Sequence, residues 1–389
     1  MNWTDDFAYL LQSVNTQCGP EGSSPRLLAN YIDVHREHQF PDLDGVDLVF
    51  LGVNESRRSE SRMNESGADA IREKLYTLFQ HGPDIKIADV GNIAPGETPH
   101  DTDHAVKTVV KNLIDRNITV IILGGSQELT FSNYAAYEIL ESTVNLAVID
   151  SSIDLGEFRE SLSPTNYLSK IVLHDPSYLF NLSVLGYQTY LSDPESINLI
   201  EKLFFDAHRL GTLVNDLRTT EPLLRNADIV SFDIQSIKNS SAPGTGQPNG
   251  FTGDQVCQMA RYAGISDKTT SIGFYNYDAG RDIHGQTAML IAQMVWCTID
   301  GFCYRQREFP LFSKKNFLEY KVHLPDGKDE MIFYKSKRTD KWWMNVPYAG
   351  GEQGKMSRHH LVPCSYSDYE QAGRGDVPDM WWRTYQKLG

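Results

Sequence analysis

Acidic and polar residues gather where three buried strands of this chain are predicted to end. The three stretches read LGGSQELTFS (residues 123–132), VIDSSIDLG (148–156) and SFDIQS (231–236). In open α/β sheets, the loops that leave the carboxyl ends of strands shape the cleft in which ligands bind. Carboxylate and amide oxygens are the side-chain ligands that hard cations prefer. We therefore expect chemistry, if any, at this edge of a sheet.

Short apolar strands alternate with helical patterns through the middle of the chain. Apolar, β-branched runs predict strands at 47–53, 119–123, 145–149 and 228–232. Apolar residues at a spacing of three to four predict helices at 68–79, 102–116, 130–140, 195–209 and 285–298. This alternation is typical of βαβ units, so we expect an α/β fold with a mainly parallel sheet covered on both faces.

The three stretches resemble, in order and with similar separations, motifs of the ureohydrolase family (arginases, agmatinases and formimidoylglutamases). The family pattern is GGDHS, then DAHxD, then SxDxD followed by an APGTGxP loop, and this chain has APGTGQP at 242–248. Gly67–Arg72 resembles the family's GPxAIR helix start, and Asp89–Gly91 resembles its DxG turn. The resemblance spans residues 40 to 305 and is nearer to formimidoylglutamases and agmatinases than to mammalian-type arginases. It implies the three-layer α/β/α arginase-like fold.

The ends of the chain lie outside this resemblance. We expect an N-terminal extension at 1–40, a ureohydrolase-like α/β domain at 41–305 and a C-terminal appendage at 306–389. The appendage should contain a β-hairpin, because FLEYKVHLPDGKDEMIFYKS places the turn signal Pro325-Asp326-Gly327 between two alternating runs. The last forty residues show no clear period, which predicts an irregular tail. The paired tryptophans of the appendage, at 342–343 and 381–382, suit either packing or an interface with a partner.

The resemblance implies a reaction in which a hydroxide bridging two manganese ions attacks an amidine or guanidine carbon. Six ligands hold these ions in the family, and three of the six are replaced here. Gln127 stands at the position of the GGDH histidine, Ser152 at the DAHxD histidine, and Gln235 at the second carboxylate of DxD. The resemblance therefore predicts that two-metal chemistry is lost.

What remains of the implied ligand set is asymmetric. Asp150, Asp154 and Asp233 survive, and Gln127 could add an amide oxygen, so one cation site would be half preserved. One interpretation is that these four residues bind a single divalent cation, manganese, magnesium or calcium. The alternative is that the carboxylates hydrogen-bond to backbone amides and cap loops, with one of them protonated to relieve repulsion.

Three further residues are expected in the substrate cleft. The glutamate that faces the guanidinium in the family aligns with Asn276, which removes a negative charge opposite a cationic group. Asp282 precedes the last helix of the implied domain, and Thr245 lies in the APGTG loop, which we interpret as a rigid wall of the cleft. The segment 158–171 contains no histidine that could shuttle protons as in arginases.

The amino-acid composition limits which partners the protein can bind and in which compartment it can function. The chain has 36 basic and 51 acidic side chains, and its formal net charge of −15 argues against nucleic acid. Its five cysteines are scattered, and no apolar run approaches the roughly 18 residues of a membrane span. We therefore expect a cytoplasmic protein with reduced thiols and no membrane span. His359, His360 and Cys364 lie close together, but adjacent histidines rarely point the same way, so a metal site is not expected there.

Three functions are compatible with these observations. The first is a ureohydrolase-fold pseudoenzyme, a binding or scaffold protein without dinuclear-manganese amidinohydrolase activity. The second is an active, divergent hydrolase of linear amidines, of the agmatinase or formimidoylglutamase type. The third is a sensor that binds a small molecule without cleaving it. The resemblance also implies a homo-oligomer, trimeric or hexameric, and the C-terminal tail could bind a protein partner.

Overall fold

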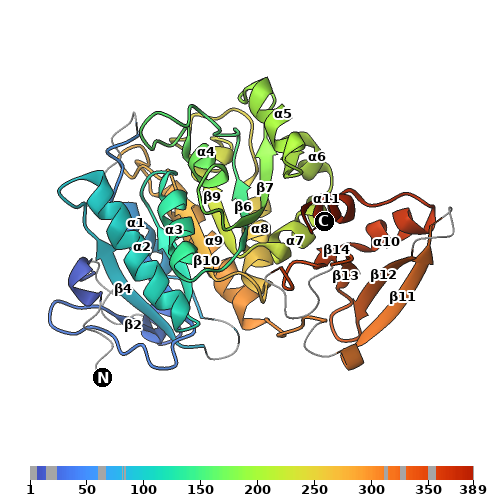
Figure 1. Cartoon of the computed structure of the whole chain (residues 1–389). Coiled ribbons are helices and arrows are strands. Elements are labelled where there is room, and N and C mark those ends of the chain that lie inside the picture. Colours follow the sequence, from blue (N-terminus) through green and yellow to red (C-terminus); the bar gives the residue numbers. More distant parts are fainter. Residues whose placement is uncertain are drawn as a thin grey trace.

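A mainly parallel sheet forms the centre of the protein (Figure 1). The computed structural model describes residues 7–14, 24–59, 67–80, 82, 85–310, 314–324, 330–348 and 356–388. Within them, ten strands pair in the order β1-β4-β3-β5-β10-β9-β6-β7-β8, with β2 also on β4. Only β1 runs antiparallel to its neighbour. The strands are β1 (Leu11–Gln12), β2 (Ile32–Val34), β3 (Leu48–Val53), β4 (Ile87–Ile93), β5 (Thr119–Leu123), β6 (Val144–Ile149), β7 (Leu179–Tyr187), β8 (Asp206–Arg209), β9 (Ile229–Asp233) and β10 (Ser271–Tyr275).

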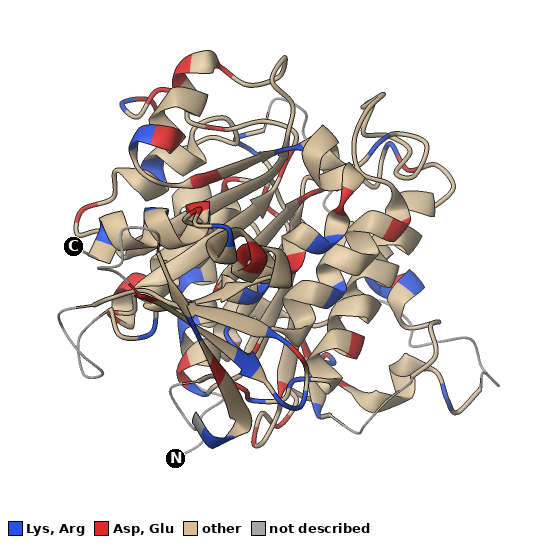
Figure 2. Ribbon diagram, turned by 90° about the vertical axis from the view of Figure 1, so that its right-hand side faces the viewer, with Lys and Arg blue, Asp and Glu red and all other residues tan. Residues whose placement is uncertain are grey.

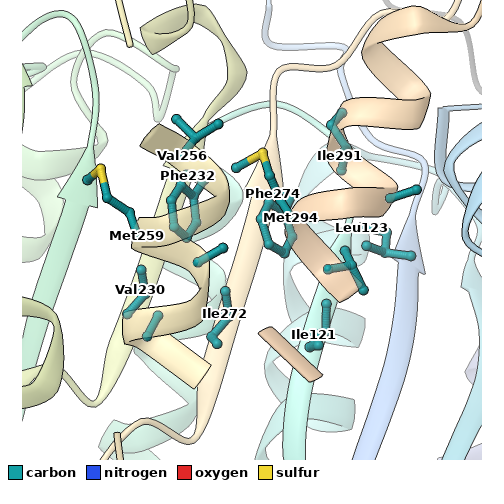
Figure 3. Close-up of a cluster of buried hydrophobic side chains, with 14 of the residues drawn as sticks. Ile121, Leu123, Val230, Phe232, Val256, Met259, Ile272, Phe274, Ile291 and Met294 are labelled. Atoms are coloured by element: carbon teal, nitrogen blue, oxygen red, sulfur yellow. The ribbon is translucent and has the colours of Figure 1, made fainter. Parts of the chain in front are cut away.

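Helices cover both faces of this sheet. One layer packs on the core that Figure 3 shows, where β5, β9 and β10 meet two long helices through Leu123, Phe232, Phe274, Met259 and Met294. It contains α1 (Gly67–Leu75), α6 (Leu210–Asn215), α7 (Thr220–Asn226), α8 (Gly253–Ile265) and α9 (Gln286–Cys303). The other contains α2 (Pro99–Asp115), α3 (Leu129–Ile139), α4 (Tyr167–Val172) and α5 (Pro194–Lys202). The arginase-like α/β fold that the sequence predicts is confirmed.

Among the predicted helices, the largest difference from the structure lies at 195–209. The helix expected at 195–209 ends at Lys202, and residues 206–209 form β8 on the edge of the sheet. Phe204 has a φ of 57°, in the left-handed region, which an α-helix cannot continue through. The apolar spacing runs on past this break, because Phe205 is buried after the helix has ended. Periodicity alone therefore overestimated the helix.

Two motifs that carry the family resemblance meet in a buried ion pair. Arg72 of α1 binds Asp89 of β4 through two hydrogen bonds, Nε to Oδ2 at 2.7 Å and Nη2 to Oδ1 at 2.9 Å. The Tyr76 hydroxyl donates to the same carboxylate at 2.7 Å. A buried charge pair is stable only when its hydrogen bonds are complete, as they are here. The GADAIR and DVG motifs therefore fix α1 on the sheet.

The C-terminal segment that follows α9 forms a second, antiparallel sheet with two helices. Its strands pair in the order β11 (Phe317–His323), β12 (Glu330–Ser336), β13 (Trp342–Asn345) and β14 (Leu361–Cys364). The predicted hairpin is β11–β12, while its turn signal at 325–327 lies outside the described residues. Short 3₁₀ helices occur at Ala8–Leu10, Leu28–Tyr31, Leu217–Thr219, Ile234–Ser236 and Lys314–Asn316.

The expectation of an irregular tail is wrong. Besides β14, the tail contains α10 (Tyr366–Gly373) and α11 (Asp379–Leu388). A capping box starts α10, in which Ser365 and Asp368 satisfy each other's backbone amides. The strand β13, which precedes the tail, was not predicted either. Its residues Trp342, Trp343 and Met344 are all buried, so apolar and polar residues do not alternate there. Pattern reading fails where both faces of a short strand are covered.

The C-terminal segment packs on α7, at the end of the sheet where the strands begin (Figure 1). Arg225 of α7 donates to the carbonyls of Trp342 and Cys364, at 3.1 and 3.2 Å. Figure 2 views the molecule from this side, and basic and acidic positions are interspersed over the ribbon. In the part of the chain that the structure describes, none of the helices has both the length and the apolar character needed to cross a membrane.

Candidate functional site

Four neighbouring strands bring the expected site residues to one edge of the sheet. The strands β5, β10, β9 and β6 lie side by side and parallel. The loop after β5 carries Gln127, Asn276 follows β10, Asp233 ends β9, and Asp150 follows β6. Gly124 and Gly125 turn the β5 loop into this edge with φ values of 88° and 78°, which suit glycine. The geometry thus collects residues that lie far apart in the sequence.

Asn276 closes this site by bridging two of the strand ends. Its side-chain oxygen accepts a hydrogen bond from the Gln127 backbone amide at 3.1 Å, and its Nδ2 donates to Asp233 Oδ2 at 2.8 Å. The other oxygen of Asp233 accepts from the Gln235 backbone amide at 2.7 Å. Asn276 holds a φ of 61°, which asparagine tolerates better than most residues. Both oxygens of Asp233 therefore have protein donors.

The second pair of carboxylates is joined by Ser152. The Ser152 backbone amide donates to Asp150 Oδ1 at 3.1 Å, and its hydroxyl donates to Asp154 Oδ1 at 3.0 Å. A serine at this position thus acts as a hydrogen-bond donor where an imidazole would be needed to bind a transition metal. The arrangement satisfies part of the negative charge without a cation.

Burial changes the protonation of these three acids. Loss of hydration raises the pKa of Asp154 to about 6 and that of Asp233 to about 7. Burial also raises the pKa of Asp150 well above its usual value, and the charges of Asp154 and Asp233 raise it further. Carboxylates that share a buried site cannot all be ionised without a compensating charge. The cluster therefore retains protons near neutral pH in the absence of a cation.

Two oxygen atoms in this cluster accept no hydrogen bond from the residues that the structure describes. Gln127 donates through Nε2 to the Ser231 hydroxyl at 2.9 Å and to the Tyr167 hydroxyl at 3.3 Å, but its Oε1 is buried and unpaired. Asp150 Oδ2 is also buried and has no such donor, while the carboxyl groups of Asp150 and Asp154 are close enough to share a proton. Buried oxygens without a donor are costly, and a hard cation or an ordered water is a suitable partner for both.

The donor set does not fit two manganese ions. Among the described residues, no group of three or more His, Cys, Asp or Glu side chains is arranged to hold a metal ion. The two unpaired oxygens belong to Gln127 and Asp150, which suits at most one hard cation held by these residues with Asp154 and Asp233. Imidazole ligands, which favour transition metals, are missing from the cluster.

The structure adds two residues that reasoning from the sequence missed. Tyr167, which begins α4, lies beside the acids, and its pKa is raised well above its usual value by burial and by the charges of Asp150 and Asp154. Glu128 is buried next to Gln127, accepts a hydrogen bond from Ser126 at 2.7 Å, and has a pKa raised to about 7 by burial. No motif marked either residue, although Glu128 is a charged residue in an otherwise buried stretch, which is an unusual sequence feature.

The expected cleft residues divide into two groups. Thr245 and Asn276 line a cavity of about 30 Å³ that also touches Gln235 and Arg281. Asp282 lies outside its lining and caps α9, since it accepts hydrogen bonds from the backbone amides of Thr287 at 3.1 Å and Ala288 at 2.8 Å. The Tyr277 hydroxyl donates to it as well, at 3.0 Å. Asp282 therefore stabilises the start of α9 and does not line the cavity.

The histidines and cysteines of the tail are placed apart from this site. His359 is buried, stacks on Phe180 at 4.1 Å between ring centroids, and contacts the Thr143 hydroxyl at 3.1 Å through Nε2. Cys364 lies in the core of the C-terminal sheet. The four cysteines in the described ranges, Cys257, Cys297, Cys303 and Cys364, are free thiols.

Comparisons with known proteins agree with this architecture. The sequence model of the arginase family matches residues 46–300, which is more than half of the chain. A formimidoylglutamase of Staphylococcus aureus is 25% identical over 243 residues, which cover 59% of this chain and 77% of that protein. A formimidoylglutamase of Streptococcus pyogenes serotype M3 is 24% identical over 294 residues, covering 69% and 89%.

Solved structures share the fold. A Trypanosoma cruzi formiminoglutamase solved with Mn²⁺ superposes with a TM-score of 0.63 at 16% identity, covering 73% of this chain and all of that one. A Bacillus subtilis formimidoylglutamase superposes with a TM-score of 0.64 at 17% identity, covering 78% and all of that chain. At such low identity these likenesses establish the scaffold, while the chemistry depends on the residues at the strand ends.

Proposed function

Because the chain belongs to the arginase family, we propose that it keeps the family's scaffold as a binding protein and has lost dinuclear-manganese hydrolysis of amidines. One observation carries this proposal. At the strand ends, hydrogen bonds from Ser152, Gln235 and Asn276 take up carboxylate oxygens that metal ions would otherwise require. A bridging hydroxide needs two metals held by a complete ligand set, and this set lacks imidazole.

The size of the cavity at this edge supports the same conclusion. The space beside Thr245 and Asn276 is about 30 Å³, roughly the volume that one water molecule occupies in the liquid. Pockets that bind small organic ligands usually measure about 300–1,000 Å³. A linear amidine would enter only if the loop that contains Thr245 moved away from Asn276.

A second candidate, hydrolysis assisted by one cation, is favoured by the two unpaired oxygens. Gln127 Oε1 and Asp150 Oδ2 could coordinate a hard cation together with Asp154 and Asp233. Such a cation would supply a Lewis acid that lowers the pKa of a bound water. Tyr167, which stays protonated because burial raises its pKa, could then donate a hydrogen bond to a leaving group.

Metal content and activity, measured on the same sample, distinguish these two functions. We expect protein purified without chelator to contain well under one equivalent of manganese, magnesium or calcium. With Mn²⁺ added, we expect no ammonia, formamide or urea from N-formimidoylglutamate, agmatine or arginine. Turnover that disappears in Asp150→Asn would overturn the proposal and establish the hydrolase, because Asp150 belongs only to the strand-end cluster.

We also propose that the chain associates with other proteins through its C-terminal helix or as a homo-oligomer. Trp382 and Tyr385 of α11 remain 48% and 40% exposed, and their rings stack at 6.1 Å. Exposed, paired aromatics are typical anchors of interfaces. Light scattering of the parent and of a Trp382→Ala, Tyr385→Ala variant tests this, since a change in mass would assign the contact to α11.

A further inference from the structure

A cavity of about 440 Å³ lies between the sheet and the C-terminal segment, at the end opposite the carboxylates. Asn226 and Lys268 in its wall come just before β9 and β10, whereas Asp233 and Asn276 follow at the other end of the same strands. Five residues at about 3.3 Å each separate the two sites by roughly 16 Å. The wall combines residues of the α/β domain, such as Arg225 and Lys268, with residues of the C-terminal segment, such as Lys341 and Trp343.

Four cations line this cavity, and two of them have donors to spare. Within the described residues, the Lys341 ammonium makes no hydrogen bond or ion pair, and burial lowers its pKa. Arg225 is only 6% exposed and pairs with Glu221 through Nε at 2.9 Å, but its Nη1 has no hydrogen-bond partner among the described residues. Lys268 binds Asn226 Oδ1 at 3.1 Å, and Arg358 pairs with Asp228. A buried donor without an acceptor costs free energy that an anionic ligand would recover.

The two acids in the wall are already occupied by other donors. Asp267 accepts hydrogen bonds from the backbone amides of Arg307 and Glu308, at 3.0 and 2.8 Å. The Glu308 carboxylate accepts from the hydroxyls of Ser336 at 2.9 Å and Thr339 at 2.7 Å. Neither carboxylate contacts the Lys341 ammonium, although the charges of Asp267 and Glu308 partly oppose the effect of burial on its pKa. The Lys341 ammonium therefore keeps its hydrogen-bond donors for a ligand.

The remaining wall is apolar and partly flat. Ile265, Phe309, Trp343 and Pro363 line the cavity, and the Arg225 guanidinium lies 4.5 Å from the centre of the Trp343 ring. An aromatic surface beside a guanidinium suits a ligand that combines a ring with a negative charge. The volume falls within the range of small-molecule sites, about 300–1,000 Å³.

We propose that this cavity binds a small organic anion, in which a carboxylate or phosphate is attached to an apolar ring. The anion would contact Lys341 and Arg225, and the ring would lie against Trp343 and Phe309. More than half of the wall comes from residues after 303, outside the range that the arginase family model matches. The C-terminal segment therefore completes the site, which shares no wall residue with the strand-end carboxylates.

Calorimetry on the full chain tests this assignment with matched probes. Benzoate and adenosine monophosphate supply a ring with a carboxylate or a phosphate, whereas benzamide and adenosine are their uncharged counterparts, and inorganic phosphate lacks the ring. We expect at least one ring anion to bind at about 1 mM or below and its neutral counterpart to bind at least about tenfold more weakly. Whichever ring anion binds identifies the source of the charge.

The variant Lys341→Met separates binding from folding. Because the ammonium has no partner, its removal should leave the melting temperature unchanged or raise it, and should weaken the ring anion at least about tenfold. Lys341→Arg should restore binding. Lys321→Met, on the outer strand β11 and outside the cavity wall, is the matched control and should bind as the parent does.

No binding of either ring anion at about 1 mM, equal binding of the neutral counterpart, or full affinity in Lys341→Met would each overturn the proposal. Equal binding of inorganic phosphate and adenosine monophosphate would remove the ring from the ligand and would contradict the assignment as well.

Discussion

The strands β9 and β10 end in a small acidic site and begin at a larger basic one. At their carboxyl ends, Asp233 and Asn276 bond to each other beside a cavity of about 30 Å³. At their amino ends, Lys268 and Arg358 line a cavity of about 440 Å³. The first site comes from the shared scaffold and has its oxygens mostly satisfied. The second is completed by the C-terminal segment and keeps unused donors.

The difference shows how a scaffold can change where it binds. At the carboxyl ends of the strands, Ser152 and Asn276 donate hydrogen bonds to Asp154 and Asp233, so the side chains of this site partly stabilise their own acids. At the amino ends, the C-terminal sheet completes a cavity of about 440 Å³. One fold can therefore carry chemically different sites at the two ends of the same strands.

Restoring the lost ligands is the strongest way to break this comparison. The triple variant Gln127→His, Ser152→His, Gln235→Asp places the family's side chains back around Asp150, Asp154 and Asp233. Since these substitutions complete both ligand sets, we expect bound manganese to rise from well under one to about two ions per chain, measured by elemental analysis. Adding Asp150→Asn to the triple variant should abolish the gain. A triple variant that folds and stays metal-free would show that the scaffold itself has changed.

The buried Lys268 at the basic end should make the free energy of unfolding depend on pH. Burial lowers the pKa of Lys268 from 10.5 to about 8, although Asp228 opposes this shift and Arg358 adds to it. Below pH 8 the folded state holds a costly buried charge. Between pH 8 and 10.5 the folded state releases this proton while the unfolded state keeps it, so the free energy of unfolding rises with pH. Relative to Lys268→Met, the parent should gain about 3 kcal/mol across this window.

Chemical denaturation at several pH values measures this difference. Lys387, whose pKa burial also lowers to about 8, is present in both proteins, so its contribution cancels. Lys337→Met, at an exposed position, is the matched control and should run parallel to the parent. A constant difference between the parent and Lys268→Met from pH 7 to about 10.5 would contradict a buried, destabilised ammonium at this end of the sheet.

Much of the acidic end could be predicted from the sequence, and little of the basic end. Gln127, Asp150 and Asp233 follow apolar strands whose order and spacing match a known family, so their meeting at one edge was predictable. The hydrogen bonds of Asn276 were not, because they depend on a left-handed φ and on which loops lie opposite. The resemblance suggested only that a negative charge had been lost there.

The basic cavity depends on contacts between distant parts of the chain. Arg225 and Trp343 lie 118 positions apart, and no local pattern indicates that a guanidinium will stack on that ring. The strand β13 was also not predicted, because it buries three consecutive residues and so lacks alternation. Packing between two sheets decides this region, and such packing leaves no periodic signal in the sequence.

A single charge placed at the acidic end gives the smallest but most specific test. Asn276→Asp keeps the shape and the acceptor for the Gln127 amide, yet replaces the amide that donates to Asp233 with a fourth carboxylate. Loss of this hydrogen bond and the added repulsion should lower the free energy of unfolding by about 2 kcal/mol. Asn249→Asp adds the same charge at an exposed position, so it should change stability by less than about 0.5 kcal/mol.

If the four acids can bind a cation, Mn²⁺ should restore the stability of Asn276→Asp and leave Asn249→Asp unchanged. Urea denaturation with and without Mn²⁺ measures both effects, and full stability of Asn276→Asp without metal would mean that the hydrogen bond to Asp233 does not hold the strand ends together.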